Sequence, residues 1–255
     1  MSLLKAFCIS FSMYSKIPMP QFEWKDKDMR YALCFFPWVG IVIGVLEACW
    51  YQVCIHFSIG NICFALVGAA IPIFVSGGFH VDGFMDTCDA LHSYQSKEKK
   101  LEILKDPHIG AFSVIMLLLY YMIFVGAYSE IATEKCFYGM CFGFAIARAL
   151  SGITLLLFPM AKKNGSLFAF QSTAQKNTVL TILVMQCVLF LCGVCFFSLE
   201  FGILAFVAVT GLVLFYYRKS KKEFGGITGD LAGYFVTLCE LLVVICAAVI
   251  SKIVL

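Results

Sequence analysis

The chain has 255 residues, of which 61% are apolar and only 14% are charged, and its formal net charge is +3. This apolar share lies far above that of soluble domains, so the composition excludes an ordinary soluble protein. It predicts one all-α domain over residues 1–255, a polytopic membrane protein with the lipid bilayer as its partner. We expect no nucleic acid as a partner, and a homo-oligomer is left open.

Seven apolar runs are long enough to cross a hydrocarbon core of about 30 Å. We expect spanning helices at residues 31–55, 60–79, 109–129, 136–160, 178–198, 200–217 and 232–254. Between the second and third runs, residues 97–106 place Leu101, Ile103 and Leu104 among charged neighbours. This pattern predicts an amphipathic helix at the membrane surface.

The basic residues predict the orientation of the chain in the membrane. Five precede the first span, four lie in 80–108, three in 161–177 and four in 218–231, which makes sixteen of the nineteen Lys and Arg. These segments share one side of a seven-span topology, and basic residues favour the cytoplasmic side. We therefore expect a multi-pass protein of the cell membrane, with the N-terminus inside and the C-terminus outside.

The most acidic stretch of the chain is residues 76–91, on the predicted cytoplasmic side. Asp82, Asp86 and Asp89 stand at i, i+4 and i+7, so on a helix they fall within a stripe of about 60°. Like charges on one face repel unless a cation lies between them. Mg²⁺ takes oxygen ligands and is commonly shared between carboxylates and substrate phosphates, so the stripe predicts a metal–phosphate site. The alternative is a solvated acidic face.

His80 lies about 160° from Asp82 if one helix runs through both residues. The preceding Gly77 and Gly78 favour a break there, which would free His80 from the helical phase. It could then be a general base, a phosphate contact or a metal ligand. A structural hydrogen-bonding role is the alternative.

Other inner segments offer more groups of the same kinds. Asp106 and Asp230 are further oxygen ligands for a metal. Lys105, Lys162 and Lys163 are candidate phosphate partners. Carboxylates and basic residues on one membrane face suggest a site for a substrate that carries a diphosphate.

A glycine-rich turn at residues 225–230 leads into the last predicted span. Backbone N–H groups at such a helix start can meet phosphate, so Gly226 and Thr228 are candidate substrate contacts. The alternative is a flexible loop.

Three charged residues lie inside predicted spans, where charges are costly and find partners. Arg148 and Glu240 lie at similar depths, roughly 18 Å and 15 Å from the inner side at 1.5 Å per residue. We expect them to pair, either as a structural ion pair or with Arg148 on a substrate phosphate and Glu240 beside it. We assign no role to Glu47.

In order, the polar motifs of the chain resemble those of cobalamin synthases, the adenosylcobinamide-GDP ribazoletransferases. The matching segments are 15–20 (SKIPMP), 36–40 (FPWVG), 77–91 (GGFHVDGFMDTCDAL), 103–112 (ILKDPHIGAF) and 225–230 (GGITGD). Arg148 falls where the family has an intramembrane Arg, and Glu240 where it has a Glu. The chain departs from the family pattern at five positions: Pro107, His108, Ser113, Tyr234 and Thr237.

The resemblance implies a Mg²⁺-dependent membrane transferase of coenzyme B12 synthesis. Its family joins adenosylcobinamide-GDP to α-ribazole or α-ribazole 5′-phosphate and releases GMP. Combined with the acidic stripe, it implies that Asp82, Asp86 and Asp89 hold Mg²⁺ on the diphosphate, with Asp230 or Asp106 completing the site.

Further roles follow from the same resemblance. His80, or one of the aspartates, would accept the proton of the attacking hydroxyl. Lys105 and Arg148 would stabilise the charge of the leaving GMP.

Two other functions are weighed. A CDP-alcohol phosphotransferase would need an Ala-Arg pair after the acidic motif, which is absent after Asp82-Gly83. A secondary transporter could use Glu47, Arg148 and Glu240 as a midplane site. Transporters tend to show internal repeats, however, and none is evident in this sequence.

Overall fold

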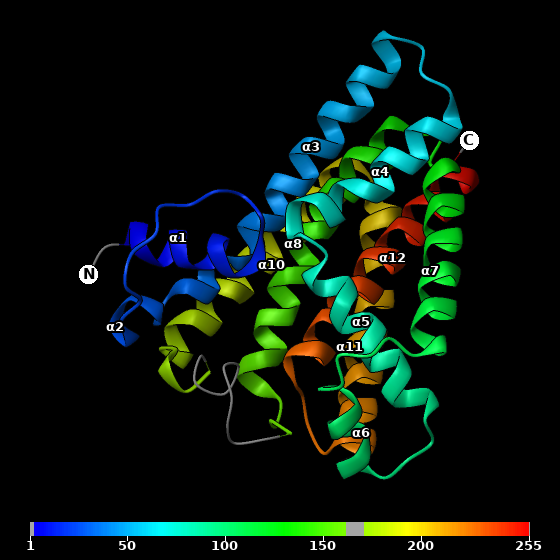
Figure 1. Ribbon diagram of the computed structural model, residues 1–255. Helices are drawn as coiled ribbons and strands as arrows, with labels where there is room; N and C mark the ends of the chain where they lie inside the picture. The colour runs from blue at the N-terminus through cyan, green and yellow to red at the C-terminus, as the bar shows by residue number, and fades with distance from the viewer. Residues whose placement is uncertain (1–2, 162–170, 255) are drawn as a thin grey trace.

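The computed structural model describes residues 3–161 and 171–254. Within them the chain forms helices and no sheet, apart from one isolated bridge between Met160 and Ile227. The elements, drawn in Figure 1, are α1 (Leu3–Tyr14), α2 (Asp26–Met29), the 3₁₀ helix η1 (Ala32–Phe35), α3 (Phe36–His56), α4 (Asn61–Ser76), α5 (Phe79–His92), α6 (Lys97–Ile103), α7 (Ala111–Ser129), α8 (Glu134–Leu157), α10 (Lys176–Phe197), α11 (Leu199–Phe224) and α12 (Gly229–Ile253).

The prediction of an all-α polytopic membrane protein is confirmed. Six helices are long and apolar enough to cross a membrane: α3, α7, α8, α10, α11 and α12. Helices α4 and α5 pass the same test only together, and they are bent by 96° at their junction. The second predicted span is therefore a broken one.

Contacts with α7 show that the bent pair crosses the whole bundle. At one end, Asn61 at the start of α4 donates a hydrogen bond to the carbonyl of Ser129, which ends α7 (3.2 Å). At the other end, Asp89 of α5 accepts one from the backbone of Gly110, just before α7 (2.7 Å). The α4–α5 pair therefore runs antiparallel to α7. In Figure 1, α1 lies at the left of the bundle and the end of α12 lies at the upper right.

The break falls at the predicted glycines. Gly77 and Gly78 have φ values of +69° and +80°, a conformation that costs glycine little, and Gly77 caps α4. Helix α5 begins at once, at Phe79, so His80 is its second residue. The expectation that His80 would be free of the helical phase was therefore wrong.

The amphipathic helix predicted at 97–106 is present as α6, and it is attached to the bundle. Lys100 is buried and forms an ion pair with Glu223 near the end of α11. Helix α11 extends seven residues past its predicted end at 217, to Phe224. The basic residues expected in a loop after this span lie on that helical extension instead.

Close backbone packing sets the centre of the bundle. Helices α8 and α12 are the most buried spans, and α3 packs along α8. A Cβ atom on Gly40 would lie 2.4 Å from the backbone oxygen of Phe144, and one on Gly44 would lie 2.3 Å from that of Cys141. Small residues allow such approach between helices where lipid gives little hydrophobic driving force.

We expect Gly40→Val to separate α3 from α8 and lower the free energy of unfolding by about 3 kcal/mol or more. Detergent-solubilised protein should then melt earlier and lose its single size-exclusion peak. Gly126→Ala is the matched control, because a Cβ there meets nothing within 4 Å. Equal melting temperatures for the two variants would contradict this account of the packing.

Candidate active site

Helix α5 presents the predicted acidic stripe. Its opposite face buries Gly83, Phe84 and Cys88 against the bundle. Asp82 is exposed, and Asp86 and Asp89 are half-buried on the remaining face. The spacing thus produces the expected arrangement, since the residues form one helix.

A fourth carboxylate reaches this stripe from α12. A Cβ on Gly83 would lie 2.7 Å from the backbone oxygen of Asp230, and one on Gly233 would lie 2.8 Å from that of His80. The two helices therefore touch backbone to backbone at this point. Asp82, Asp89 and Asp230 all lie near enough to Asp86 for their charges to interact with its carboxylate. We call these four residues the acidic cluster.

Within the acidic cluster, Asp89 also stabilises the start of α7. Its two carboxylate oxygens accept hydrogen bonds from the backbone N–H groups of Gly110 (2.7 Å) and Ser113 (2.9 Å). These are donors that the first turn of α7 leaves unpaired, so Asp89 caps that helix from α5. Its part in metal binding stays a prediction.

Asp106 lies in a local pair and not in the acidic cluster. Its Oδ1 contacts the backbone nitrogen (3.0 Å) and the imidazole Nδ1 (2.6 Å) of His108. These hydrogen bonds lower the pKa of the exposed Asp106 carboxyl below its ordinary value. The neighbouring Lys105 is exposed, and it takes part in none of the ion pairs between described residues.

The glycine-rich turn is fixed by the end of α8. The backbone of Ile227 donates to Pro159 (2.9 Å) and accepts from Ala161 (3.0 Å). A Cβ on Gly226 would lie 2.4 Å from the carbonyl oxygen of Pro159, which explains the glycine structurally. Thr228 accepts a hydrogen bond from the backbone of Leu231 (3.2 Å) and so caps α12. The predicted phosphate contacts of this turn stay predictions.

Lys162 and Lys163, the other predicted phosphate partners, follow directly after Ala161. They lie outside the described residues, so their roles stay predictions.

The predicted pair inside the membrane is confirmed. Arg148 Nη1 lies 2.7 Å from Glu240 Oε1 and also donates to the carbonyl of Phe144 (2.8 Å). The two residues are only 1% and 6% exposed. Both line a small internal cavity of about 10 Å³ together with His80. His80 thus faces the bundle interior, away from the acidic stripe.

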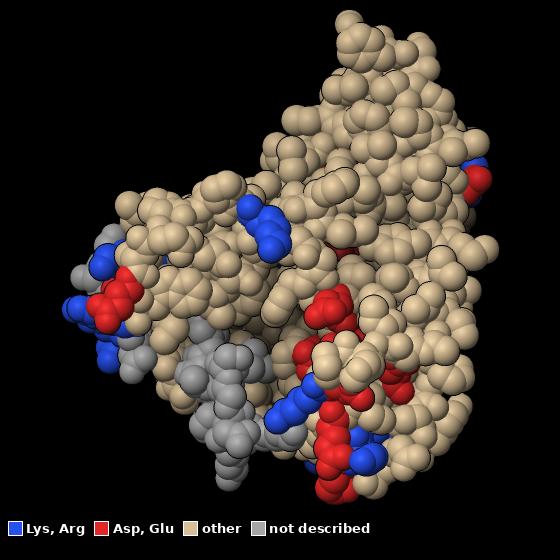
Figure 2. Space-filling view, in the orientation of Figure 1, with Lys and Arg blue, Asp and Glu red and all other residues tan. Residues whose placement is uncertain are grey.

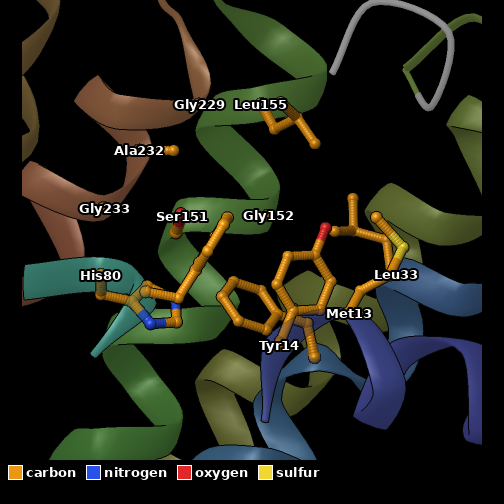
Figure 3. A pocket seen from close by; sticks show the side chains of 12 residues that line it. Met13, Tyr14, Leu33, His80, Ser151, Gly152, Leu155, Gly229, Ala232 and Gly233 are labelled. Carbon is orange, nitrogen blue, oxygen red and sulfur yellow. The ribbon is translucent and has the colours of Figure 1, made fainter. Parts of the chain in front are cut away.

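An apolar pocket lies next to these groups, and sequence reasoning missed it. Figure 3 shows it between α1, η1, α3, α5, α8 and α12, with an empty volume of about 630 Å³ that includes its open mouth. Tyr14, Phe36, His80 and Gly229 are among its lining residues. Its described lining residues come from six elements far apart in the sequence and include no Asp, Glu, Lys or Arg, so they form no motif.

Charged side chains are sparse on the visible surface of the spanning helices. In Figure 2, Asp and Glu side chains gather over α5 and α6, while the part of the bundle formed by α3 and α4 is almost free of charge. This separation matches a membrane-embedded part and a polar end that holds the acidic cluster.

Comparison with known proteins decides the family. Over residues 6–248 the sequence matches the family described as Cobalamin-5-phosphate synthase. The chain belongs to this family. The resemblance seen in its motifs is thereby confirmed.

Named relatives agree over almost their whole lengths. A protein of Lachnoclostridium phytofermentans is 41% identical over 95% of this chain and 92% of its own length. A protein of Clostridium perfringens strain 13 is 34% identical over 92% of this chain and 94% of its own. Both carry the name Adenosylcobinamide-GDP ribazoletransferase. No solved structure matches the chain.

The buried ion pair gives a stability prediction. Glu240→Leu leaves the charge of Arg148 buried without its partner, so we expect a loss of about 3–5 kcal/mol in the free energy of unfolding. The double variant Arg148→Met/Glu240→Leu should recover most of this loss, because no charge is then left unpaired. Chemical unfolding in detergent measures both. A double variant no more stable than the single one would contradict the pairing.

Proposed function

We propose that the chain joins adenosylcobinamide-GDP to α-ribazole or α-ribazole 5′-phosphate. GMP leaves, and adenosylcobalamin or its 5′-phosphate forms in the nucleotide-loop assembly step of cobalamin biosynthesis. The observation that carries this proposal is the family match over residues 6–248, together with relatives of that name aligned over more than nine tenths of their lengths.

The reaction replaces the phosphoanhydride bond to GMP with a phosphate ester bond to the ribazole. The 3′-hydroxyl oxygen of the ribazole forms a bond to the phosphorus attached to the cobinamide side. The bond from that phosphorus to the GMP oxygen breaks, and the hydroxyl proton passes to a base. Such a transfer depends mainly on alignment and on neutralising the charge of the diphosphate.

The acidic cluster has the chemistry of a magnesium site that is shared with a substrate. Asp82, Asp86 and Asp230 offer only oxygen ligands and form no ion pair among the described residues. In the described part of the chain, no group of three or more His, Cys, Asp or Glu side chains is arranged to hold a metal alone. Mg²⁺ bound between these carboxylates and the diphosphate would neutralise charge on the transferring group.

We assign the proton of the attacking hydroxyl to a carboxylate of this cluster. Asp82 and Asp86 lie on the open face of α5, whereas His80 points into the bundle from its other side. A general base must come within hydrogen-bond reach of the proton that it takes. Arg148 pairs with Glu240 inside the bundle. Its contact with the leaving GMP stays a prediction.

The transporter alternative gains nothing from the contacts of the intramembrane charges. Arg148 and Glu240 form an ion pair through Arg148 Nη1, while the buried Arg148 Nε has no hydrogen-bond partner among the described residues. Glu47 accepts a hydrogen bond from Tyr128 instead (2.6 Å). The three side chains therefore do not combine into one midplane site.

We further propose that the polar end with the acidic cluster faces the cytoplasm from the cell membrane. The sixteen basic residues in the inner segments support this orientation.

Removal of a cluster carboxylate tests the site. We expect Asp82→Asn and Asp86→Asn each to lower kcat/KM by about two to three orders of magnitude, because charge neutralisation at the phosphorus is lost. Purified protein with adenosylcobinamide-GDP, α-ribazole 5′-phosphate and Mg²⁺ is followed by GMP release and corrinoid mass.

The controls of this experiment show whether a loss of activity is specific to the acidic cluster and to Mg²⁺. Glu102→Gln removes an exposed carboxylate of α6 that pairs with Lys99, and it should retain wild-type turnover. EDTA should abolish wild-type turnover, and added Mg²⁺ should restore it. Full activity in both aspartate variants would refute the proposed site, and activity that survives EDTA would refute the metal.

Reporter fusions test the orientation in a bacterial host. Alkaline phosphatase fused after residue 254 should be active, because it folds only outside the cytoplasm. The same enzyme inserted after residue 95, between α5 and α6, should be inactive. The reverse pattern would place the acidic cluster outside the cell.

A further inference from the structure

The pocket beside α5 is large enough for a ligand and has no assigned occupant. Its cavity volume is about 110 Å³, and its empty space is about 630 Å³ when the open mouth is counted. A Cβ on Gly229 at its edge would meet nothing within 4 Å, so space is open there. The side chain of Ala232, one turn further along α12, also lines this space (Figure 3).

Flat aromatic rings form one side of the pocket. The ring of Phe36 lies 4.2 Å from that of Tyr14 and 5.7 Å from the imidazole of His80, with an angle of 9° to the imidazole. These rings pack against one another, so they give the pocket a flat, largely apolar wall. Among the described residues, no Asp, Glu, Lys or Arg side chain lines the pocket.

Two residues that line the pocket lie close in sequence to members of the acidic cluster. Gly229, at its edge, directly precedes Asp230 along α12. His80, in its wall, lies two residues before Asp82 on α5. A nucleoside whose base fills the pocket would thus have its sugar beside the carboxylates.

We propose that this pocket binds the planar base of the acceptor nucleoside, and that His80 donates a hydrogen bond to the one free ring nitrogen of that base. This assignment rests on the proposed function. His80 is only 4% exposed, and its Nδ1 has no hydrogen-bond partner among the described residues. A neutral imidazole carries one N–H donor and one acceptor nitrogen, which suits a single polar contact.

The polar groups of the pocket favour the ribazole base over guanine, the other planar base in the reaction. Guanine presents several donors and acceptors along one edge, and burying them without partners is costly. In the described part of the chain, the polar side chains that line the pocket are those of Tyr14, Ser151 and His80, and no carboxylate is among them. A benzimidazole-type base is apolar except for one ring nitrogen, which matches this set.

Filling the pocket is the first test. Ala232→Leu adds three carbon atoms toward the pocket, and Ala208→Leu makes the same change on α11, away from it. We expect Ala232→Leu to raise KM for α-ribazole at least tenfold, with KM for adenosylcobinamide-GDP and inhibition by GMP changed less than twofold. Ala208→Leu should leave all three unchanged.

Removing one atom from each partner tests the hydrogen bond. An acceptor riboside with indole in place of benzimidazole lacks the free ring nitrogen. Wild type should bind it about tenfold more weakly, as expected for one lost hydrogen bond in a closed site. His80→Phe should bind both ribosides alike, and His80→Gln, which keeps an N–H donor, should restore part of the preference.

Failure of the pocket assignment and failure of the proposed function give different results. If wild type turns over but Ala232→Leu weakens GMP or the corrinoid substrate instead, or changes nothing, the pocket does not hold the acceptor base. If His80→Phe still prefers the benzimidazole riboside over the indole riboside as strongly as wild type, His80 does not bind the base. If wild type makes no product, the proposed function fails, and calorimetry with α-ribazole alone decides the pocket: binding that Ala232→Leu abolishes supports it, and no binding overturns it.

Discussion

The close contact between α5 and α12 is the constraint on which the site depends. Gly83 and Gly233 let the two backbones touch, and a side chain at either position would push the helices apart. This contact brings Asp230 to the stripe on α5 and places His80 over the start of α12. The acidic cluster and the apolar pocket therefore both contain residues of α5 and α12, and the geometry of both depends on this helix–helix contact.

The charged residues of the bundle occur in two different arrangements. Arg148 and Glu240 neutralise each other deep in the core, which lowers the cost of keeping both away from water. The carboxylates of Asp82, Asp86 and Asp230 have no such partner among the described residues. Their negative charges lie close enough to interact, and a cation held there, as we propose, would reduce that repulsion.

The sequence predicted what depends on local pattern. Apolar runs located the six long spanning helices and α4, the first part of the bent pair, and the spacing of the acids predicted their shared face on α5. The matching depths of Arg148 and Glu240 predicted their pair. The bend between α4 and α5, the capping of α7 by Asp89 and the aromatic pocket could not be read in this way, because each depends on how distant segments meet. The phase of His80 was mispredicted because a two-glycine turn needs no further residues before the next helix starts.

The polarity of α5 has a consequence for how the protein enters its membrane. An aspartate at the centre of a spanning helix would cost about 2.5–3.5 kcal/mol in translocon-based scales, and the three aspartates of α5 avoid this cost at the polar end of the bundle. Such a segment cannot partition into lipid by itself. Its stabilising partners, α7 and α12, come later in the chain, and α12 is the last helix described. The contacts that hold α5 in place are therefore complete only once α12 has been synthesised, so the acidic cluster cannot form before that helix exists.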